Sequence, residues 1–293
     1  MGIISEVFGY LLNLLYTAFN NYGVAIIVFS LILRIILMPI TIKQQKTMKK
    51  TTEMQEKMQE ISRKYKNNPE KLNQETIELY KNEKMSPFSG CLSSIVQIII
   101  ILSVFWVVSQ PLTYMKNLDD VQYSEDSEQS VLEYYNEKLQ EENDGQSTSY
   151  YQIQIINKYG SEDERIYINM NFLGLDLSKV PGNNLDDWTV YIIPALYVIS
   201  SVVSIRMSTK KSNKKKEENI VVDKEGNVEP DEMEAVEAMN KNMMYMMPIM
   251  SVLIAFIAPL GLALYWFVSN IFTTVEKIVI EKIMKRKEEK ENA

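Results

Sequence analysis

The chain has 293 residues, of which 46% are hydrophobic, and a formal net charge of -7; its mean hydropathy of -0.14 is unremarkable. It contains one cysteine, Cys91, and no histidine, which excludes a disulfide framework and argues against a zinc site or a Cys-His nucleophile. The hydrophobic residues gather in long uncharged runs that can cross a bilayer core about 30 Å thick. The sequence therefore predicts an all-α polytopic membrane protein with five transmembrane helices.

Residues 1–20 predict a helix that lies in the membrane surface. They lack the basic segment and the small-residue cleavage site of a signal peptide. Two helical stripes differ in polarity, one holding Ile3, Val7, Leu11, Leu14 and Ala18 and the other holding Glu6, Gly9, Asn13 and Thr17. We therefore expect residues 1–20 to form an interfacial amphipathic helix.

The first predicted span, residues 21–42, carries a single arginine, Arg34. At about 1.5 Å per residue, Arg34 lies about 13 Å from the inner end of the run at Lys43, near the bilayer midplane. A guanidinium keeps its charge at every cellular pH, and exposing it to lipid there would cost between about 3 and more than 10 kcal/mol.

Three arrangements would remove that cost: Arg34 snorkels to the interface, pairs inside the helix bundle, or lines a wet cavity. Snorkelling is hindered by the depth of the residue. Pairing lacks an obvious partner, because no Asp or Glu lies deep within the other apolar runs. We therefore favour the wet cavity.

Residues 43–85 predict two cytoplasmic helices packed as a hairpin. The helices separate at Asn67-Asn68-Pro69, because Pro69 cannot continue one helix but can begin the next. The first helix carries an apolar stripe of Met54, Met58, Ile61 and Tyr65. This stripe indicates a docking element with adaptable apolar surface, and the alternative is a solvated charged connector.

The second span, residues 86–111, contains Gln97 about two turns from its inner end. A glutamine within a span most often bonds a neighbouring helix, which is worth about 0.6–2 kcal/mol. Helix packing is therefore at least as good an interpretation of Gln97 as a functional polar site.

The connection at residues 112–187 predicts a small folded region. Val131, Leu132, Tyr135 and Leu139 indicate an amphipathic helix within residues 127–142. Apolar residues that alternate with polar ones on either side of residues 158–164 predict a small β-hairpin, and they are Ile153, Ile155, Ile166, Ile168, Met170 and Phe172.

The rest of the chain predicts three further spans. They are residues 188–207, 241–258 and 259–280, with a cytoplasmic loop at 208–240 and a basic tail at 281–293. A methionine-rich run at residues 239–250 indicates either an adaptable core or a surface for varied apolar guests. Trp266 and Asn270 lie one turn apart on the last span.

The charges near the spans predict the orientation. Residues 43–84 hold eleven Lys and Arg against seven Glu, and residues 206–216 hold six basic residues and no acids. Residues 112–187 hold five basic and sixteen acidic residues. Because basic connections stay in the cytoplasm, we expect the amino terminus and residues 112–187 outside and the carboxyl terminus inside.

Motifs for enzymatic chemistry are absent: the sequence has no glycine-rich phosphate loop, no Walker lysine and no metal-binding spacing of His and Cys. An intramembrane arginine is also typical of a small-anion or solute transporter. No repeat relates the two halves of the chain, as it does in many transporters. A third interpretation is a structural assembly factor for the Sec translocon, which needs no wet groove.

Several segments together carry a resemblance to a known family. They are Asn21–Ile27, Leu33-Arg34, Met38–Thr41, Lys66–Glu75, Gly90–Leu92 with Gln97, Phe172–Leu177, Met246–Ile249 and Gly261–Asn270. In this order they resemble the YidC and Oxa-type membrane protein insertases, in their five-span bacterial form. The resemblance covers nearly all the chain except about residues 113–170.

The resemblance implies a hydrophilic groove that opens to the cytoplasm and to lipid. Arg34 matches the groove arginine, Gln97 and Trp266 match polar and aromatic groove positions, and Asn270 completes the candidate set. The implied function is insertion and folding of new membrane proteins in the bacterial cell membrane, alone or with the Sec translocon. The implied partners are nascent clients, the ribosome, the Sec translocon and the lipid bilayer, with no DNA, small-molecule substrate, cofactor, metal or catalytic residue.

Overall fold

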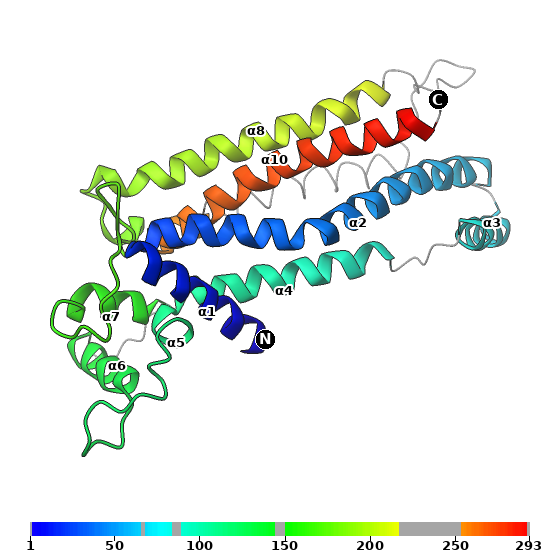
Figure 1. Cartoon of the computed structure of the whole chain (residues 1–293). Coiled ribbons are helices and arrows are strands. Elements are labelled where there is room, and N and C mark those ends of the chain that lie inside the picture. Colours follow the sequence, from blue (N-terminus) through cyan, green and yellow to red (C-terminus); the bar gives the residue numbers. More distant parts are fainter. Residues whose placement is uncertain (1, 66–67, 84–88, 144–149, 217–252, 292–293) are drawn as a thin grey trace.

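The structure of the chain is a computed structural model that describes residues 2–65, 68–83, 89–143, 150–216 and 253–291. Long helices lie side by side in an elongated bundle (Figure 1), namely α2 (Tyr22–Lys64), α4 (Ser89–Ser109), α8 (Ile192–Lys216) and α10 (Leu260–Glu291). Helices α2, α8 and α10 begin at the same end of the bundle, and α4 runs in the opposite direction. The smaller elements of residues 111–191 gather at the end where those three helices begin.

Within the described residues, four helical stretches are long and apolar enough to cross a membrane. They are Gly2–Phe19, Tyr22–Thr47, Trp188–Met207 and Leu260–Ile283. The apolar stretch of α4 in the described residues, Ile98–Ser109, is shorter than these four stretches. Most of the predicted fourth span lies outside the described residues, although residues 253–257 are helical.

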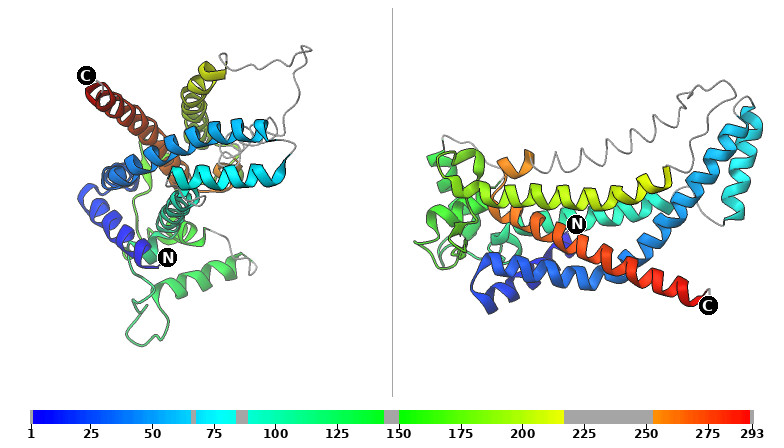
Figure 2. Two further views of the ribbon diagram at one scale, coloured as in Figure 1. Left: turned by 90° about the vertical axis from the view of Figure 1, so that its right-hand side faces the viewer. Right: turned by 90° about the horizontal axis from the view of Figure 1, so that it is seen from above.

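Helix α2 continues without a break from the predicted first span into the predicted hairpin. Asn21 caps its start, since the Asn21 side chain accepts a hydrogen bond from the N–H of Val24 at 3.1 Å. Pro39 lies inside the helix, lacks an N–H and clashes with the preceding turn. This explains why α2 bends along its length (Figure 2).

The predicted start of the second helix of the hairpin, at Pro69, is confirmed. Helix α3 (Pro69–Asn82) begins with Pro69 in its first turn, and the Asn68 side chain accepts a hydrogen bond from the N–H of Lys71 at 3.1 Å. The end of α2 and α3 lie beside each other, away from the ends of α8 and α10 (Figure 2).

Helix α1 (Gly2–Phe19) is inclined to the long helices and packs on α2 and α4 (Figure 1). Its buried side is formed by Ser5, Gly9, Leu12 and Tyr16. Ile3, Val7 and Leu14 of the predicted apolar stripe are instead exposed. The apolar stripe of α1 is thus free to contact lipid, whereas its small residues allow close packing on the protein.

The predicted helix within residues 127–142 is confirmed as α6 (Val131–Glu142), whose buried residues are the four predicted ones. Ser130 and Glu133 form a capping box at its start. Short helices precede and follow it, namely α5 (Pro111–Tyr114) and α7 (Tyr151–Tyr159).

The predicted β-hairpin at residues 153–172 is wrong, because its first half is the helix α7. Ile153, Ile155, Ile156 and Tyr159 are all buried. Ile156 follows Ile153 by three positions and Tyr159 follows Ile155 by four, which is the spacing of one helical face. Two two-residue strands occur further on, β1 (Asn171–Phe172) and β2 (Leu175–Asp176), joined by a tight turn with Gly174 at a φ of 82°.

This small hairpin fastens the start of α2. The Asn21 side chain donates a hydrogen bond to the carbonyl of Asn171 at 2.7 Å. Gly23 makes room for the Phe172 ring, since a Cβ on Gly23 would lie 2.4 Å from Phe172 Cγ. Two of the segments that carry the family resemblance therefore meet in the fold.

The residues after the hairpin fasten the start of α10. The N–H of Gly261 donates to the carbonyl of Leu177, and the N–H of Leu260 donates to the carbonyl of Lys179, each at 2.9 Å. Two single-turn 3₁₀ helices, η1 (Pro181–Asn183) and η2 (Trp188–Tyr191), then lead into α8. The region 169–191 thus holds the three long helices at the end where they begin.

Candidate functional site

Arg34 lies on α2 and turns its side chain towards α10. Its Nη2 donates a hydrogen bond to the Ser269 hydroxyl at 2.8 Å, and its Nη1 lies 3.6 Å from the Glu276 carboxylate. Ser269 and Glu276 are seven residues apart, which places them two turns apart on one face of a helix. The guanidinium therefore bridges two polar groups on that face of α10.

The expectation that Arg34 lacks an acidic partner is wrong. Glu276 lies immediately after the apolar run 260–275, within the predicted span 259–280 but near its carboxyl-terminal end. In the fold its side chain is only 4% exposed, whereas that of Arg34 is 21% exposed. The long reach of an arginine side chain allows it to meet an acid at the border of a run on a neighbouring helix.

The contact between Arg34 and Glu276 is an ion pair without a hydrogen bond. Within the described part of the chain, neither carboxylate oxygen of Glu276 has a hydrogen-bond partner, although both are buried. Buried carboxylates normally accept several hydrogen bonds, because losing water is costly for a charged group. Among the described residues, the ion pair with Arg34 is consequently what offsets the cost of burying the Glu276 carboxylate.

A small cavity lies beside the guanidinium, between α2, α4 and α10. Its volume is about 20 Å³, enough for about one water molecule and far too small for a peptide. It is lined by Ser30, Leu33, Arg34, Leu37, Ile100, Tyr265 and Ser269. The described residues thus enclose a small pocket at Arg34 whose lining is partly polar, and the wet cavity inferred from the sequence stays a prediction.

Trp266 and Asn270 lie on another face of α10, towards α8. The Asn270 side chain donates to the hydroxyls of Ser200 and Ser201 at 3.1 and 3.0 Å, and the Trp266 ring lies 6.5 Å from that of Tyr197. These contacts tie α8 to α10 in the manner typical of polar residues between membrane helices. They do not bring Trp266 or Asn270 to the guanidinium of Arg34.

Gln97 lies on α4, and its side chain is outside the described residues. Of the candidate residues, Arg34 therefore contacts one face of α10, whereas Trp266 and Asn270 lie on the face towards α8. The residues that sequence reasoning missed are Ser269 and Glu276. The spacing of Tyr265, Ser269 and Glu276 along one helical face is the signal that could have revealed them.

The predicted docking stripe lies against α3. Met54 is only 5% exposed, the Tyr80 hydroxyl donates to Met58 Sδ at 3.6 Å, and the Tyr65 hydroxyl donates to Glu75 Oε1 at 3.1 Å. Lys57 and Glu83 form an ion pair between the two helices. The stripe therefore holds the hairpin together, and Ile77 of α3 is 55% exposed on its outside.

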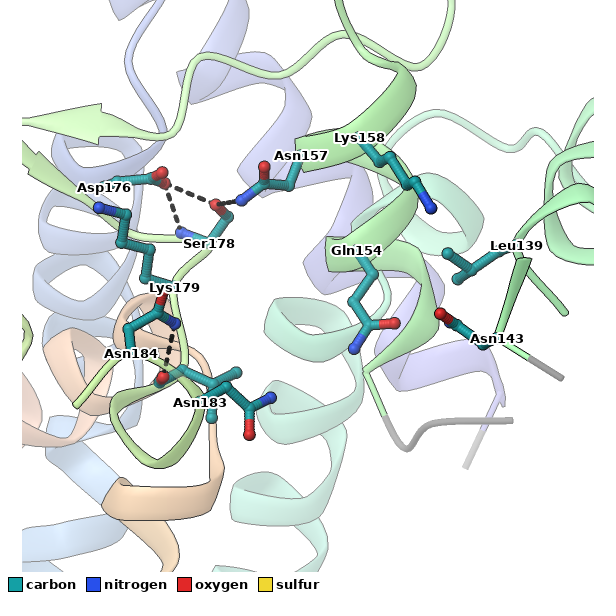
Figure 3. Close-up of a pocket in the computed structure, with 11 residues that line it drawn as sticks. Leu139, Asn143, Gln154, Asn157, Lys158, Asp176, Ser178, Lys179, Asn183 and Asn184 are labelled. Carbon is teal, nitrogen blue, oxygen red and sulfur yellow. Dashed lines mark hydrogen bonds between the residues drawn. The ribbon is translucent and has the colours of Figure 1, made fainter. Parts of the chain in front are cut away.

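An open cleft of about 770 Å³ lies among the short elements of residues 111–191 (Figure 3). It is lined by Leu139, Asn143, Gln154, Asn157, Lys158, Asp176, Ser178, Lys179, Val180, Asn183 and Asn184. Asn157 donates to the Ser178 hydroxyl at 2.6 Å, as Figure 3 shows. The other side-chain amides offer both donors and acceptors to a neutral polar molecule.

The two lysines of this cleft are neutralised by neighbouring acids. Lys158 pairs with Glu142, and Lys179 lies 2.7 Å from Asp187. The hydrogen bond from Lys179, with further hydrogen bonds from Thr189, lowers the pKa of Asp187 to about 2. The remaining charged residue of the lining is Asp176, whose carboxylate accepts hydrogen bonds from the N–H and the hydroxyl of Ser178.

Comparison with known proteins relates this chain to one family. A family model described as 60Kd inner membrane protein matches residues 14–288. A relative from Fusobacterium nucleatum, named membrane protein insertase YidC, is 24% identical over 281 residues, which cover 96% of each chain.

Two further relatives carry the same name. The protein from Caldanaerobacter subterraneus is 43% identical over 105 residues, which cover 36% of this chain and 51% of the relative. The protein from Treponema denticola is 24% identical over 284 residues, which cover 97% of this chain and 38% of the relative. The chain thus spans about half or less of these two relatives and nearly all of the Fusobacterium protein.

Proposed function

The chain belongs to the 60Kd inner membrane protein family, whose matched relatives are membrane protein insertases, and we propose that it inserts new membrane proteins by admitting their polar segments to the Arg34 site. Its clients are nascent membrane proteins, and its place is a bacterial membrane. The family is one of insertases and chaperones, so the proposal concerns binding and transfer rather than covalent chemistry.

The observation that carries the proposal is a permanent charge inside a helix that can cross a membrane. Arg34 lies within the stretch Tyr22–Thr47 and keeps part of its side chain exposed. Intramembrane charges normally mark the path of a polar substrate. A partly exposed guanidinium at this position lowers the cost of bringing a hydrophilic client segment into the bilayer.

We place the Arg34 site in a bundle of five spans, with the amino terminus outside and the carboxyl terminus in the cytoplasm. A client tail that is usually acidic enters a hydrophilic groove at Arg34 from the cytoplasm, while its apolar helix slides along the third and fifth spans into lipid. Burial of about 20 apolar residues drives release, at a few tenths of a kcal/mol or more for each residue. A membrane potential that is positive outside also favours outward movement of negative charge, by about 2.3 kcal/mol per charge per 100 mV.

The cytoplasmic hairpin of α2 and α3 serves in this proposal as the contact for the ribosome and the Sec translocon. Its exposed face, with Ile77 beside lysines and glutamates, supports such a role. The packed stripe of Met54, Met58, Ile61 and Tyr65 then acts by keeping the hairpin rigid. The insertase works alone or with Sec.

The test is insertion into proteoliposomes. A single-span client with an acidic outer tail is added to vesicles containing the purified protein, and protection of the tail from external protease is measured. We expect several-fold more protected tail than in protein-free vesicles, with Arg34→Lys retaining most of the effect if charge suffices. Equal protection with and without the protein would refute the proposal.

The same vesicles separate the alternatives. A small-anion transporter would carry a labelled anion across the membrane without affecting the client. A structural assembly factor would raise insertion only when Sec is present, and equally with Arg34→Gln. The insertase interpretation requires client insertion without Sec that depends on the Arg34 site.

A further inference from the structure

Glu276 is a buried charged group to which the proposed function gives no task. Its side chain is 4% exposed, and neither carboxylate oxygen has a hydrogen-bond partner among the described residues. Such a group is costly unless a cation lies close to it. The described cation that does so is Arg34, whose Nη1 lies 3.6 Å from Glu276 Oε2.

The pairing also changes what a client meets. An isolated guanidinium presents a full positive charge to an approaching carboxylate, whereas a guanidinium beside Glu276 belongs to a site that is neutral overall. Arg34 is the more exposed partner, at 21% against 4%. A client carboxylate can therefore approach the guanidinium from the open side, while Glu276 stays on the protein side.

Arg34 has a second anchor that does not depend on Glu276. Its Nη2 donates to the Ser269 hydroxyl at 2.8 Å. Loss or displacement of the Glu276 contact therefore leaves the guanidinium bonded to α10. The Ser269 contact can therefore keep the guanidinium in place, whereas the Glu276 contact determines the net charge of the site.

We propose that Glu276 is a specificity-determining residue: it is the resident counter-ion of Arg34, and the carboxylate of a client tail must compete with it. This inference rests on the proposed insertase function and deepens it. Glu276 weakens the preference for acidic tails, so that tails with few or no acids are also accepted.

The test uses the Glu276→Gln variant, which keeps the shape of the side chain and removes its charge. Two clients differ only in the outer tail, one with Asp and Glu and the other with Asn and Gln at the same positions. Insertion of both is measured by protease protection in proteoliposomes with equal amounts of folded insertase. We expect the ratio of acidic to neutral insertion to rise about fivefold over wild type, the size of a modest coupling between two sites.

Two further variants show whether charge is the cause. Glu276→Asp should keep the wild-type ratio, because it keeps the counter-ion. The double variant Arg34→Gln with Glu276→Gln should bring the ratio close to one, because neither charge remains. A purely structural Glu276 would lower insertion of both clients together and leave the ratio unchanged.

An unchanged ratio in Glu276→Gln, with wild-type insertion above that of empty vesicles, would overturn the role of Glu276 and leave the insertase intact. If wild type inserts neither client better than empty vesicles, the proposed function fails and this inference fails with it.

Discussion

The guanidinium of Arg34 on α2 lies 3.6 Å from the carboxylate of Glu276 on α10, although the two residues are more than two hundred positions apart in the sequence. This ion pair joins α2 to α10 at the polar pocket. It also removes the energetic anomaly of a lone arginine in an apolar run, because each charge compensates for burial of the other. The stability and the charge of the pocket are consequently linked.

Arg34→Gln should destabilise the fold by about 3 kcal/mol, because it leaves Glu276 buried without a cation. Adding Glu276→Gln should restore much of that loss. Unfolding in mixed micelles measures both, and Arg286→Gln on the exposed end of α10 is the matched control, expected within about 0.5 kcal/mol of wild type. Equal losses for Arg34→Gln and the double variant would contradict the pairing.

Tyr22→Phe should cost about 1–2 kcal/mol of stability, the usual penalty for a buried acceptor that loses its donor. The Tyr22 hydroxyl is buried and donates to the carbonyl of Val108 at 3.0 Å, in the last turn of α4. Tyr10→Phe provides the control, because Tyr10 is 72% exposed. A thermal melt that shifts equally for both variants would rule out this contribution.

Gly23→Ala should destabilise the end of the bundle where α2 begins by about 1–3 kcal/mol through overpacking. The added Cβ would lie 2.4 Å from Phe172 Cγ, whereas a Cβ on the control position Gly2 would meet its nearest neighbour at an ordinary 3.5 Å. Combining Gly23→Ala with Phe172→Ala should cost less than the sum of the two single changes. Strict additivity would show that the ring does not limit this position.

Asp187 should add a pH-dependent part to the stability. Its pKa of about 2, lowered by the hydrogen bonds from Lys179 and Thr189, lies below the value of about 3.9 expected in the unfolded chain. The contribution is therefore present above about pH 4 and disappears as the pH falls towards 2. The stability difference between wild type and Asp187→Asn should shrink across this window, and a constant difference would contradict the assignment.

Patterns that depend on one segment were predictable from the sequence. The helix of residues 131–142 follows from four apolar residues on one stripe, and the break before α3 follows from Asn68 and Pro69. The error at residues 153–159 arose because Ile153 and Ile155 fit a two-residue period when Ile156 and Tyr159 are ignored.

Features that depend on packing between segments were not predictable. The apolar stripe of α1 faces outward because Gly9 approaches Tyr114 too closely for any side chain. Glu276 was missed because the sequence shows where an apolar run ends but does not show which neighbouring helix the residues at that end face. The sequence therefore predicted the position of the candidate site at Arg34, but not its partners Ser269 and Glu276 on α10.

The entry of client tails beside Arg34 is tested most directly by photo-crosslinking from two neighbouring positions on α2. Leu37 lines the pocket with Arg34, and Ile36 is 60% exposed on the outside of the helix. With a ribosome-stalled single-span client, we predict that a probe at Leu37 crosslinks the polar tail and that a probe at Ile36 does not. Tail crosslinks from Ile36 equal to those from Leu37, or none from Leu37, would contradict the account.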